Sequence, residues 1–385
     1  MDTRDALEKI KILNALAGKG ALNLSDAQIV SLDFTALYPS IPQLDLIEKL
    51  RKMIVFGFNL ALAQHNTKNE AKLNEVFMLC EPFPSKAEAI WHFGKSTDQL
   101  PDGHKLVSQE MLVDYSTFVI ENAFICFGAA KTVYQIVEGF PTGTNAAPEM
   151  ANIYLLSYEF EYWQRQLPSW HSLKREHQLF LASYSRYIDD IIAIIGTDFN
   201  WKTMVYKTDD HDGIFPELLK TRKGEEIQAL EVTGSFGESC NYLDLEVMLS
   251  KKGKITYDLY DKKTESLSMV ENCQGGEEKL SEMRTFPHID TCLPTTTKYG
   301  VLGAQMFRFG ERSSFGIDFM DNVCNQIIKM IRFGYNAKKL LAIVKKFNKW
   351  NLSLGRSSRL KWAIIKRIKI WLIRNRRKAT GRSRV

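Results

Sequence analysis

Periodic and alternating hydrophobic positions predict both helices and strands along the chain. Apolar residues at three- and four-residue spacing predict a helix over 6–17, and "QIVSLDF" (28–34) has the content of a strand. A second helix is predicted to begin at Pro42, because proline suits the first helical position. The segment 65–108 is polar and holds three prolines, so it is predicted to be irregular.

The second part of the chain has stronger patterns. A helix is predicted over about 109–127, and a glycine-broken loop then leads into another helix that begins near Ala147. An apolar stripe at helical spacing in that second helix consists of Ala147, Met150, Ala151, Tyr154, Leu155 and Tyr158. Further on, "NYLDLEVML" and "KITYDLYD" are strand-like, and increasingly basic helices are predicted over about 314–374.

Two adjacent acidic residues, Asp189 and Asp190, interrupt the apolar segment "FLASYSRYIDDIIAIIGT" (180–197). Burying one unpaired carboxylate costs several kcal/mol, and two neighbouring carboxylates also repel each other. Such a pair is stable at a turn, at a metal ion, or at both. The flanking tyrosines and isoleucines predict a hairpin with the carboxylates at its turn, and a merely polar turn is the simpler alternative.

Charge is distributed unevenly along the chain. Of the 51 Lys and Arg, 19 lie between Asn322 and Val385, in a stretch without Asp or Glu, so the first 321 residues carry 32 bases against 45 acids. A basic end favours a polyanionic partner such as nucleic acid, because each neutralised phosphate releases counterions. A solvated basic helix or a nuclear-targeting tail would have the same composition.

Composition excludes several classes of protein. The chain has 385 residues, 45% hydrophobic and 25% charged, which suffices for one large or two to three smaller globular domains. No apolar run approaches the roughly 20 residues that span a bilayer, so no membrane partner is predicted. The charged start "MDTRDALEKIKIL" is unlike a secretory signal. Six scattered cysteines without zinc spacing predict reduced thiols, mostly in the core of an intracellular protein.

Three blocks combine into one candidate site: Asp33 at a strand end, the glycine-rich loop before Ala146, and the Asp189-Asp190 turn. Carboxylates on two neighbouring strand ends can hold two divalent cations about 4 Å apart, which activate an attacking hydroxyl and stabilise a leaving group. Mg²⁺ suits this arrangement, because it takes oxygen ligands and keeps positions for substrate phosphates. Asp33 could otherwise cap a helix or turn.

The order and wording of these blocks resemble the palm of a reverse transcriptase, specifically that of Penelope-like retroelements, which are related to telomerase. The resemblance extends over about Ile29 to Tyr335. The similar segments are "LDFTALYPSIP" (32–42), "FVIENAFICFGAAKTVYQIVEGFPTGTNAAPEMANIYL" (118–155), the Asp-Asp turn, "CNYLDLEV" (240–247), "TYDLYDKKT" (256–264) and "FPHIDTCLPTTTKYGVLGAQMFRF" (286–309).

The resemblance implies an α+β fold: a right-hand polymerase palm with an antiparallel sheet and helices, a helical thumb and a basic C-terminal tail. It implies RNA-directed DNA synthesis, in which a primer 3′-OH attacks a dNTP with two Mg²⁺ (or Mn²⁺) ions. Asp33 and Asp189 would bind both ions, the Phe34 carbonyl would assist, and Asp190 would be a third, less essential carboxylate. The implied bounds are 1–27 for an N-terminal helical segment, 28–262 for the palm with partial fingers insertions, 263–350 for the thumb-like helical region and 351–385 for the basic tail.

The resemblance also implies contacts with an RNA template, a DNA primer and a dNTP. Tyr38 stands five residues after Asp33, where reverse transcriptases hold an aromatic ring against the sugar, so it would exclude a 2′-OH. A core aromatic is the alternative for Tyr38. Gln305 and Arg308 would lie in the thumb near the primer. The residues expected at the template and the incoming base pair are Gln135, Pro141, Gly143 and Asn145.

The chain differs from the family at both ends. Relatives have a much longer fingers region before the strand of Asp33, whereas only 32 residues precede Asp33 in this sequence. The last 50 residues lack a GIY-YIG nuclease pattern. We therefore expect a fragment, a truncated copy, or fingers supplied by a second chain. The alternative function is a catalytically weak nucleic-acid-binding protein, while Tyr38 disfavours an RNA-synthesising polymerase. The basic tail and the family's occurrence in eukaryotes predict an intracellular location and leave a nuclear one open.

Overall fold

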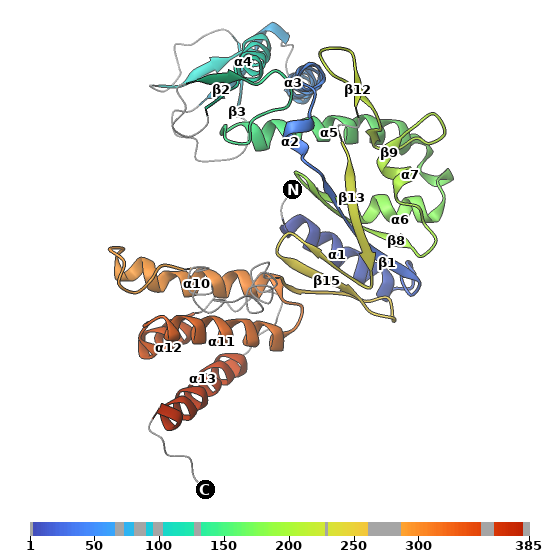
Figure 1. Ribbon diagram of the computed structural model, residues 1–385. Helices are drawn as coiled ribbons and strands as arrows, with labels where there is room; N and C mark the ends of the chain where they lie inside the picture. Colours follow the sequence, from blue (N-terminus) through green and yellow to red (C-terminus); the bar gives the residue numbers. More distant parts are fainter. Residues whose placement is uncertain are drawn as a thin grey trace. The chain divides into compact units, whose positions relative to one another are not determined.

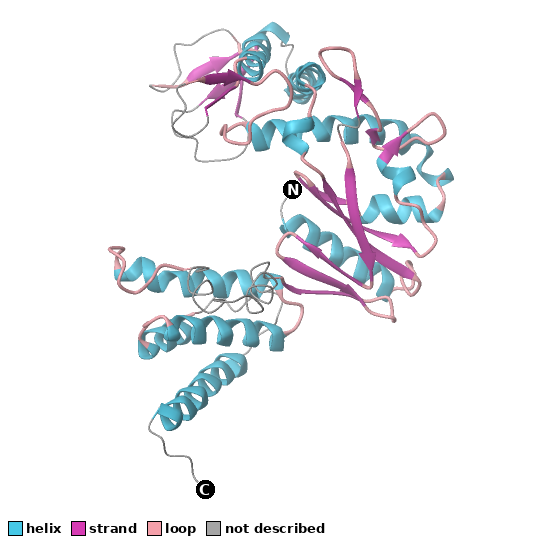
Figure 2. Cartoon of the chain, in the orientation of Figure 1, coloured by secondary structure: helices cyan, strands magenta, loops and turns pink. Residues whose placement is uncertain are grey.

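The computed structural model describes residues 3–65, 73–80, 90–94, 103–126, 132–227, 230–260, 286–347 and 358–379. The chain divides into two compact units, of which one comprises 1–31 and 236–385 and the other comprises 32–235. Helices and strands are interleaved along the chain (Figures 1 and 2). No helix among the described residues has both the length and the apolar character to cross a bilayer.

A four-stranded sheet with the order β13-β1-β8-β7 carries the predicted Asp-Asp hairpin. Its strands are β1 (Ala27–Phe34), β7 (Ser185–Tyr187), β8 (Asp190–Gly196) and β13 (Val232–Gly237). β7 and β8 pair antiparallel, and Tyr187 lies opposite Asp190. Ile188 and Asp189 therefore form the two-residue turn, and Asp190 is the first residue of β8. The predicted strand over 28–34 and the predicted hairpin are both confirmed, but of the two carboxylates only Asp189 lies in the turn.

The helix after the glycine-rich loop, α5 (Ala147–Gln166), is also confirmed. Pro148 lies in its first turn, and all six residues of the predicted apolar stripe are buried. α5 packs against α3 (Gln43–His65) and β10 (Phe215–Pro216), while α6 (Arg175–Ser183) packs against β8. The unit has shorter elements as well: α2 (Leu37–Ser40), η1 (Leu73–Glu75), η2 (Leu167–Ser172), α7 (Lys202–Val205), β9 (Tyr206–Lys207), β11 (Leu219–Lys220) and β12 (Glu226–Ile227).

The prediction of irregular structure over 65–108 was wrong for the described part of that segment. β2 (Val76–Cys80) pairs antiparallel with both β3 (Ile90–Phe93) and β4 (Lys105–Val107). This small sheet packs on α3, where the rings of Phe58 and Trp91 meet edge to face with centroids 5.0 Å apart. α4 (Gln109–Glu121) ends before the predicted 127, because a hairpin of β5 (Phe124–Cys126) and β6 (Val133–Gln135) follows it.

The unit of 1–31 and 236–385 combines an antiparallel sheet with a helical bundle. Its elements are α1 (Thr3–Gly18), β14 (Ser239–Tyr242), β15 (Leu245–Leu249), β16 (Ile255–Leu259), α10 (Thr295–Arg312), α11 (Gly316–Arg332), α12 (Ala337–Lys346) and α13 (Ser358–Ala379). The bundle encloses fully buried side chains such as Leu302, Met306 and Ile327. The hydrophobic pattern alone did not predict α10, although the resemblance placed this segment in a helical thumb, whereas α11, α12 and α13 confirm the predicted C-terminal helices.

The cysteines of the described residues are all free thiols. Cys240 and Cys324 are buried, whereas Cys126 and Cys292 are exposed and Cys80 is half-buried, so core filling holds for only some of them. The sixth cysteine, Cys273, lies outside the described residues.

Candidate active site

The two predicted metal-binding carboxylates stand on neighbouring strand ends. The Phe34 amide donates a hydrogen bond to the Asp189 carbonyl over 3.2 Å, which ties the end of β1 to the β7–β8 turn. Asp33 is exposed, and Asp189 and Asp190 are half-buried, so none of the three residues belongs to the buried core. On the other side of β1, the Thr35 amide donates to the Glu231 carbonyl over 2.8 Å, just before β13 begins.

The turn itself has an unusual backbone. Ile188 has φ 53°, which is the left-handed region that β-branched residues rarely adopt. A positive φ at the first position suits a tight two-residue hairpin, and glycine would normally supply it. The side chain that precedes the turn by two positions, Arg186, donates to the Ile188 carbonyl over 2.9 Å.

Arg186 is part of a buried network on α5. Its guanidinium forms a two-pronged ion pair with Glu159, at 2.6 and 2.9 Å, and reaches the Asn152 side chain at 2.8 Å. The Tyr184 hydroxyl donates to the same Glu159 carboxylate over 2.5 Å. Burial alone would lower the pKa of Arg186, but the Glu159 carboxylate raises it above its usual value.

Tyr38 experiences the negative charges of the candidate site. The pKa of its phenol is raised first by burial and then by the negative charges of Asp189 and Glu149. Tyr38 therefore stands within electrostatic range of the Asp-Asp turn and of the first turn of α5. Its own backbone carbonyl accepts a hydrogen bond of 2.8 Å from the Phe140 amide, so it also touches the glycine-rich loop.

The start of the glycine-rich loop is fixed by close backbone contacts. Gly139 has φ +75°, and a Cβ at this position would come within 2.5 Å of the Pro39 carbonyl oxygen. The Gly139 amide donates to the Ile41 carbonyl over 3.1 Å. The fully buried Gln43 donates to the carbonyls of Ile136 and Gly139, both at 3.0 Å. Sequence reasoning missed Gln43, because a glutamine at a helix start carries no such signal.

The predicted template contacts occupy different surroundings. Gln135 is exposed at the end of β6 and donates to the Glu121 carbonyl over 2.8 Å. In the loop before α5, Pro141 is half-buried, while Gly143 and Asn145 are exposed. The exposed residues of the loop therefore follow Phe140, whose backbone amide is hydrogen-bonded to the Tyr38 carbonyl. The side-chain amide of Gln135 instead binds the last residue of α4.

The two residues predicted near the primer belong to the other unit. Gln305 and Arg308 both lie on α10, and Gln305 is half-buried. Two nitrogens of Arg308 donate to Asp244 at 3.0 and 2.8 Å, and Arg312 pairs with the same carboxylate at 2.6 Å. Asp244 lies in the turn between β14 and β15, so the guanidinium of Arg308 anchors α10 to that hairpin.

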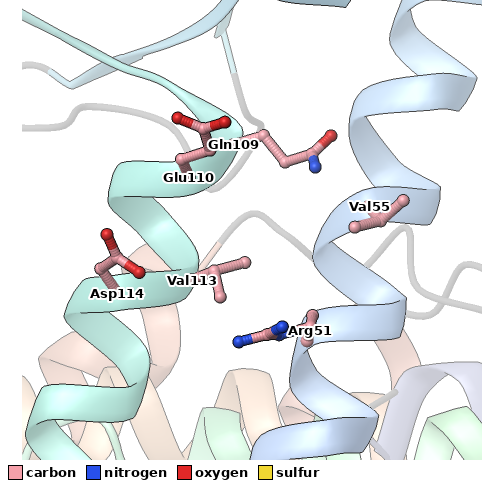
Figure 3. A pocket seen from close by; sticks show the side chains of 6 residues that line it. All are labelled: Arg51, Val55, Gln109, Glu110, Val113 and Asp114. Atoms are coloured by element: carbon pink, nitrogen blue, oxygen red, sulfur yellow. The ribbon is translucent and has the colours of Figure 1, made fainter.

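A cavity of about 310 Å³ lies between α3 and α4 (Figure 3). Its lining contains none of the predicted site residues and consists of Arg51, Val55, Gln109, Glu110, Val113 and Asp114. Figure 3 shows Arg51 on one helix facing Val113 and Asp114 on the other. Sequence reasoning had no signal for this cavity, because its two walls come from helices separated by the small β2–β4 sheet.

The acidic residues fit magnesium in one specific way. Among the described residues no group of three or more His, Cys, Asp or Glu side chains is placed to hold a metal ion. Mg²⁺ commonly binds through one or two carboxylates and completes its coordination with water and phosphate oxygens. The oxygen donors of Asp33 and Asp189, on adjacent strand ends and open to solvent, match that mode of binding rather than a site closed by protein ligands.

Comparison with known proteins adds the fold to this picture. No family model and no curated protein matches the sequence. The structure of telomerase from Candida albicans in complex with the TWJ fragment of telomeric RNA matches with a TM-score of 0.52 and 12% identity, covering 96% of this chain and 50% of that chain. Telomerase from Candida tropicalis in complex with the same type of RNA fragment matches with a TM-score of 0.41 and 13% identity, covering 96% of this chain and 50% of that one.

The Candida albicans match establishes the fold. The chain spans half the length of that telomerase, and at 12% identity the likeness concerns the fold alone. The described residues form a mixed arrangement of helices and antiparallel sheets that matches the polymerase fold of that telomerase. The α+β polymerase fold predicted from the sequence is therefore confirmed.

Proposed function

We propose that the chain is an RNA-directed DNA polymerase that adds dNTPs to a primer 3′-OH. The observation that carries this proposal is the hydrogen bond from the Phe34 amide to the Asp189 carbonyl, which holds two carboxylate-bearing strand ends side by side. The telomerase-like fold supports a nucleotidyl transferase. Tyr38, in the field of Asp189, supports the choice of deoxynucleotides.

Asp33 and Asp189 would hold Mg²⁺, or Mn²⁺ in its place, with Asp190 adjoining them. Two bound ions supply activation of the attacking hydroxyl and neutralisation of the leaving group. The protein contributes position: the β1–β8 pairing fixes the two carboxylates, and the loop held by Gln43 and Gly139 borders the space beside Tyr38. Asp33 is exposed, so a triphosphate could approach this space from the side of Asp33.

The finer identity is an intracellular Penelope-like retroelement enzyme that copies RNA, with a nuclear location left open. The wording of the palm blocks and the basic C-terminal stretch support this part of the proposal. RNA template, DNA primer and dNTP are the proposed partners, and a second chain that supplies fingers is the proposed complement. The assay described next supplies the RNA template, the primer and the dNTP.

Mg²⁺-dependent dNTP incorporation on a primed RNA template tests the proposal. The native chain should extend the primer, and Asp189→Ala should abolish extension, because the charge at the turn is removed. The matched control is Asp209→Ala, since Asp209 and Asp210 form a second, exposed Asp-Asp pair in the same unit but outside the sheet. Equal extension by native and Asp189→Ala proteins would overturn the proposal.

A nucleic-acid-binding protein without polymerase activity is the second candidate. The observation that favours it is α13, which has nine Lys and Arg and no Asp or Glu over Ser358–Ala379. Binding of a primed RNA template by both native and Asp189→Ala proteins, together with no incorporation by either in Mg²⁺ or Mn²⁺, would establish this candidate instead.

A further inference from the structure

Arg186 connects the Asp-Asp turn to α5 through nearly every polar atom of its side chain. The guanidinium holds Glu159 by two contacts, and Nη1 and Nη2 reach the side chain and the carbonyl of Asn152 at 2.8 and 3.3 Å. Nη1 additionally donates to the Ile188 carbonyl over 2.9 Å. The Arg186 and Glu159 side chains are 4% and 9% exposed, so solvent competes little for these contacts.

The contact with the Ile188 carbonyl acts on a turn that needs support. An isoleucine at φ 53° is disfavoured on its own, because its branched Cβ crowds the backbone in the left-handed region. The surrounding structure must therefore hold this conformation. Arg186 binds the carbonyl of the strained residue itself, while its other nitrogens are fixed on a helix.

The held turn continues directly into the candidate site. The Ile188 carbonyl and the Asp189 amide form one peptide unit. The next carbonyl, that of Asp189, accepts the hydrogen bond of 3.2 Å from the Phe34 amide. A rotation of the Ile188 peptide would therefore move the Asp189 carboxylate and loosen its strand from the one that bears Asp33. This chain of contacts runs from α5, through Arg186 and the turn, to both carboxylates.

We propose that Arg186, anchored by Glu159 and Asn152, is the positioning residue that sets the Asp189 carboxylate relative to Asp33. The assignment rests on the proposed polymerase function for its catalytic consequence. The ion pair alone would secure β7 to α5 without any contact to the turn. The additional bond to the Ile188 carbonyl is what makes Arg186 a positioning residue and more than a structural anchor.

Two variants separate positioning from folding. Arg186→Lys retains the charge but lacks the planar fork, so it cannot bind Glu159, Asn152 and the Ile188 carbonyl together. The double variant Arg186→Met/Glu159→Leu replaces the buried pair by apolar side chains, a change that proteins often tolerate. The matched control is Arg165→Met. Arg165 also lies on α5, and its ion pair with Asp212 is exposed to solvent, with the two side chains 39% and 41% exposed.

Hydrogen exchange of backbone amides reports on the conformation of the turn whether or not the protein has polymerase activity. In both Arg186 variants the Phe34 amide should exchange at least about tenfold faster, because its acceptor on Asp189 is no longer held. The Ile194 amide, which donates to the Ser183 hydroxyl at 2.7 Å elsewhere on β8, should remain protected. Unchanged exchange at Phe34 in a folded variant would overturn the proposal.

Primer extension measures the effect of a displaced Asp189 carboxylate on catalysis. Both variants should lower kcat by about 100-fold, as a misplacement of about 1 Å can do, with KM for dNTP within about threefold of the native value. Arg165→Met should retain native kcat. Native kcat in a variant whose Phe34 amide exchanges faster would overturn the positioning role. If the native chain incorporates no nucleotide, the proposed function fails, while exchange at Phe34 still decides whether Arg186 holds the turn.

Discussion

Tyr38 experiences the charges of Asp189 and Glu149, which together with burial raise the pKa of its phenol. A ring so near the carboxylates would meet the sugar of a nucleotide bound there. Tyr38→Ala should therefore reduce discrimination against ribonucleotides by at least about tenfold, because the steric exclusion of a 2′-OH is removed. Single-nucleotide incorporation with paired dNTP and rNTP measures the ratio. Tyr38→Phe keeps the ring and should retain discrimination, and equal ratios for all three proteins would refute the gate.

Two glycines of the same loop should respond differently to the same substitution. Gly139→Ala places a Cβ within 2.5 Å of the Pro39 carbonyl oxygen at φ +75°, so it should lower the free energy of unfolding by about 1–3 kcal/mol. A methyl group at Gly143 would meet no atom within 4 Å, and the φ of Gly143 is not positive, so Gly143→Ala should change the free energy of unfolding little. Urea unfolding of both variants provides the comparison, and similar losses of stability would contradict it.

Among the helices and strands, local pattern was sufficient wherever one element determines its own core face. The alternation of β1, the 3- and 4-residue stripe of α5 and the apolar flanks of the β7–β8 hairpin each predicted the element that formed. Hydrophobic pattern alone did not predict α10, because Gly300 and Gly303 weaken its helix propensity, and only the resemblance placed a helical thumb here. Burial of Leu302 and Met306 in the bundle supplies the stability of α10 instead. β2, β3 and β4 are too short to show a period.

The candidate site was only half accessible to sequence reasoning. Asp33 and Asp189 could be predicted because each lies at the end of an apolar strand. The partners that position them could not, since Glu159 precedes Arg186 by 27 residues and no local spacing relates the two. Gln43 likewise reaches carbonyls 93 and 96 residues away. Such contacts exist only once α3 and α5 have packed.

The Asp45 carboxylate joins α3 to α5, beside the ion pair of Lys49 and Glu161 at 2.8 Å. Asp45 Oδ2 accepts from Tyr154 and Tyr158 at 2.6 and 2.5 Å, and both phenols are buried. Asp45→Ala should lower the free energy of unfolding by about 1–3 kcal/mol for each phenol left without an acceptor. Asp45→Asn retains an acceptor and should destabilise the protein less. Urea unfolding measures both variants.

The same helix offers a control for the Asp45 experiment. Glu48 pairs with Lys52 at 2.7 Å on the exposed face of α3, and such i,i+4 pairs contribute about 0.3–0.5 kcal/mol. Glu48→Ala should therefore leave the urea midpoint nearly unchanged. A destabilisation by Glu48→Ala as large as that by Asp45→Ala would show that the phenol contacts are not what secures α3 to α5.

Over the full length of the chain, charge is segregated. The acidic excess of the first 321 residues contrasts with the nine bases of α13. One face of α13 packs in the bundle through Ile364, Ile365 and Ile368, and Lys366 and Lys369 lie on the exposed side. A basic face that is free of carboxylates on its own helix is suited to a phosphate backbone.

Binding measured against salt concentration tests this assignment. Lys366→Glu with Lys369→Glu should weaken binding of a primed RNA template and reduce the slope of log K against log salt by about 0.7–0.9 for each phosphate that is no longer neutralised. Lys19→Glu, at an exposed base after α1, changes net charge in the same direction and should leave the slope near native, because its effect is unspecific. If the double variant and the control gave the same slope, net charge rather than the α13 face would account for binding, and the proposed nucleic-acid surface would have to lie elsewhere.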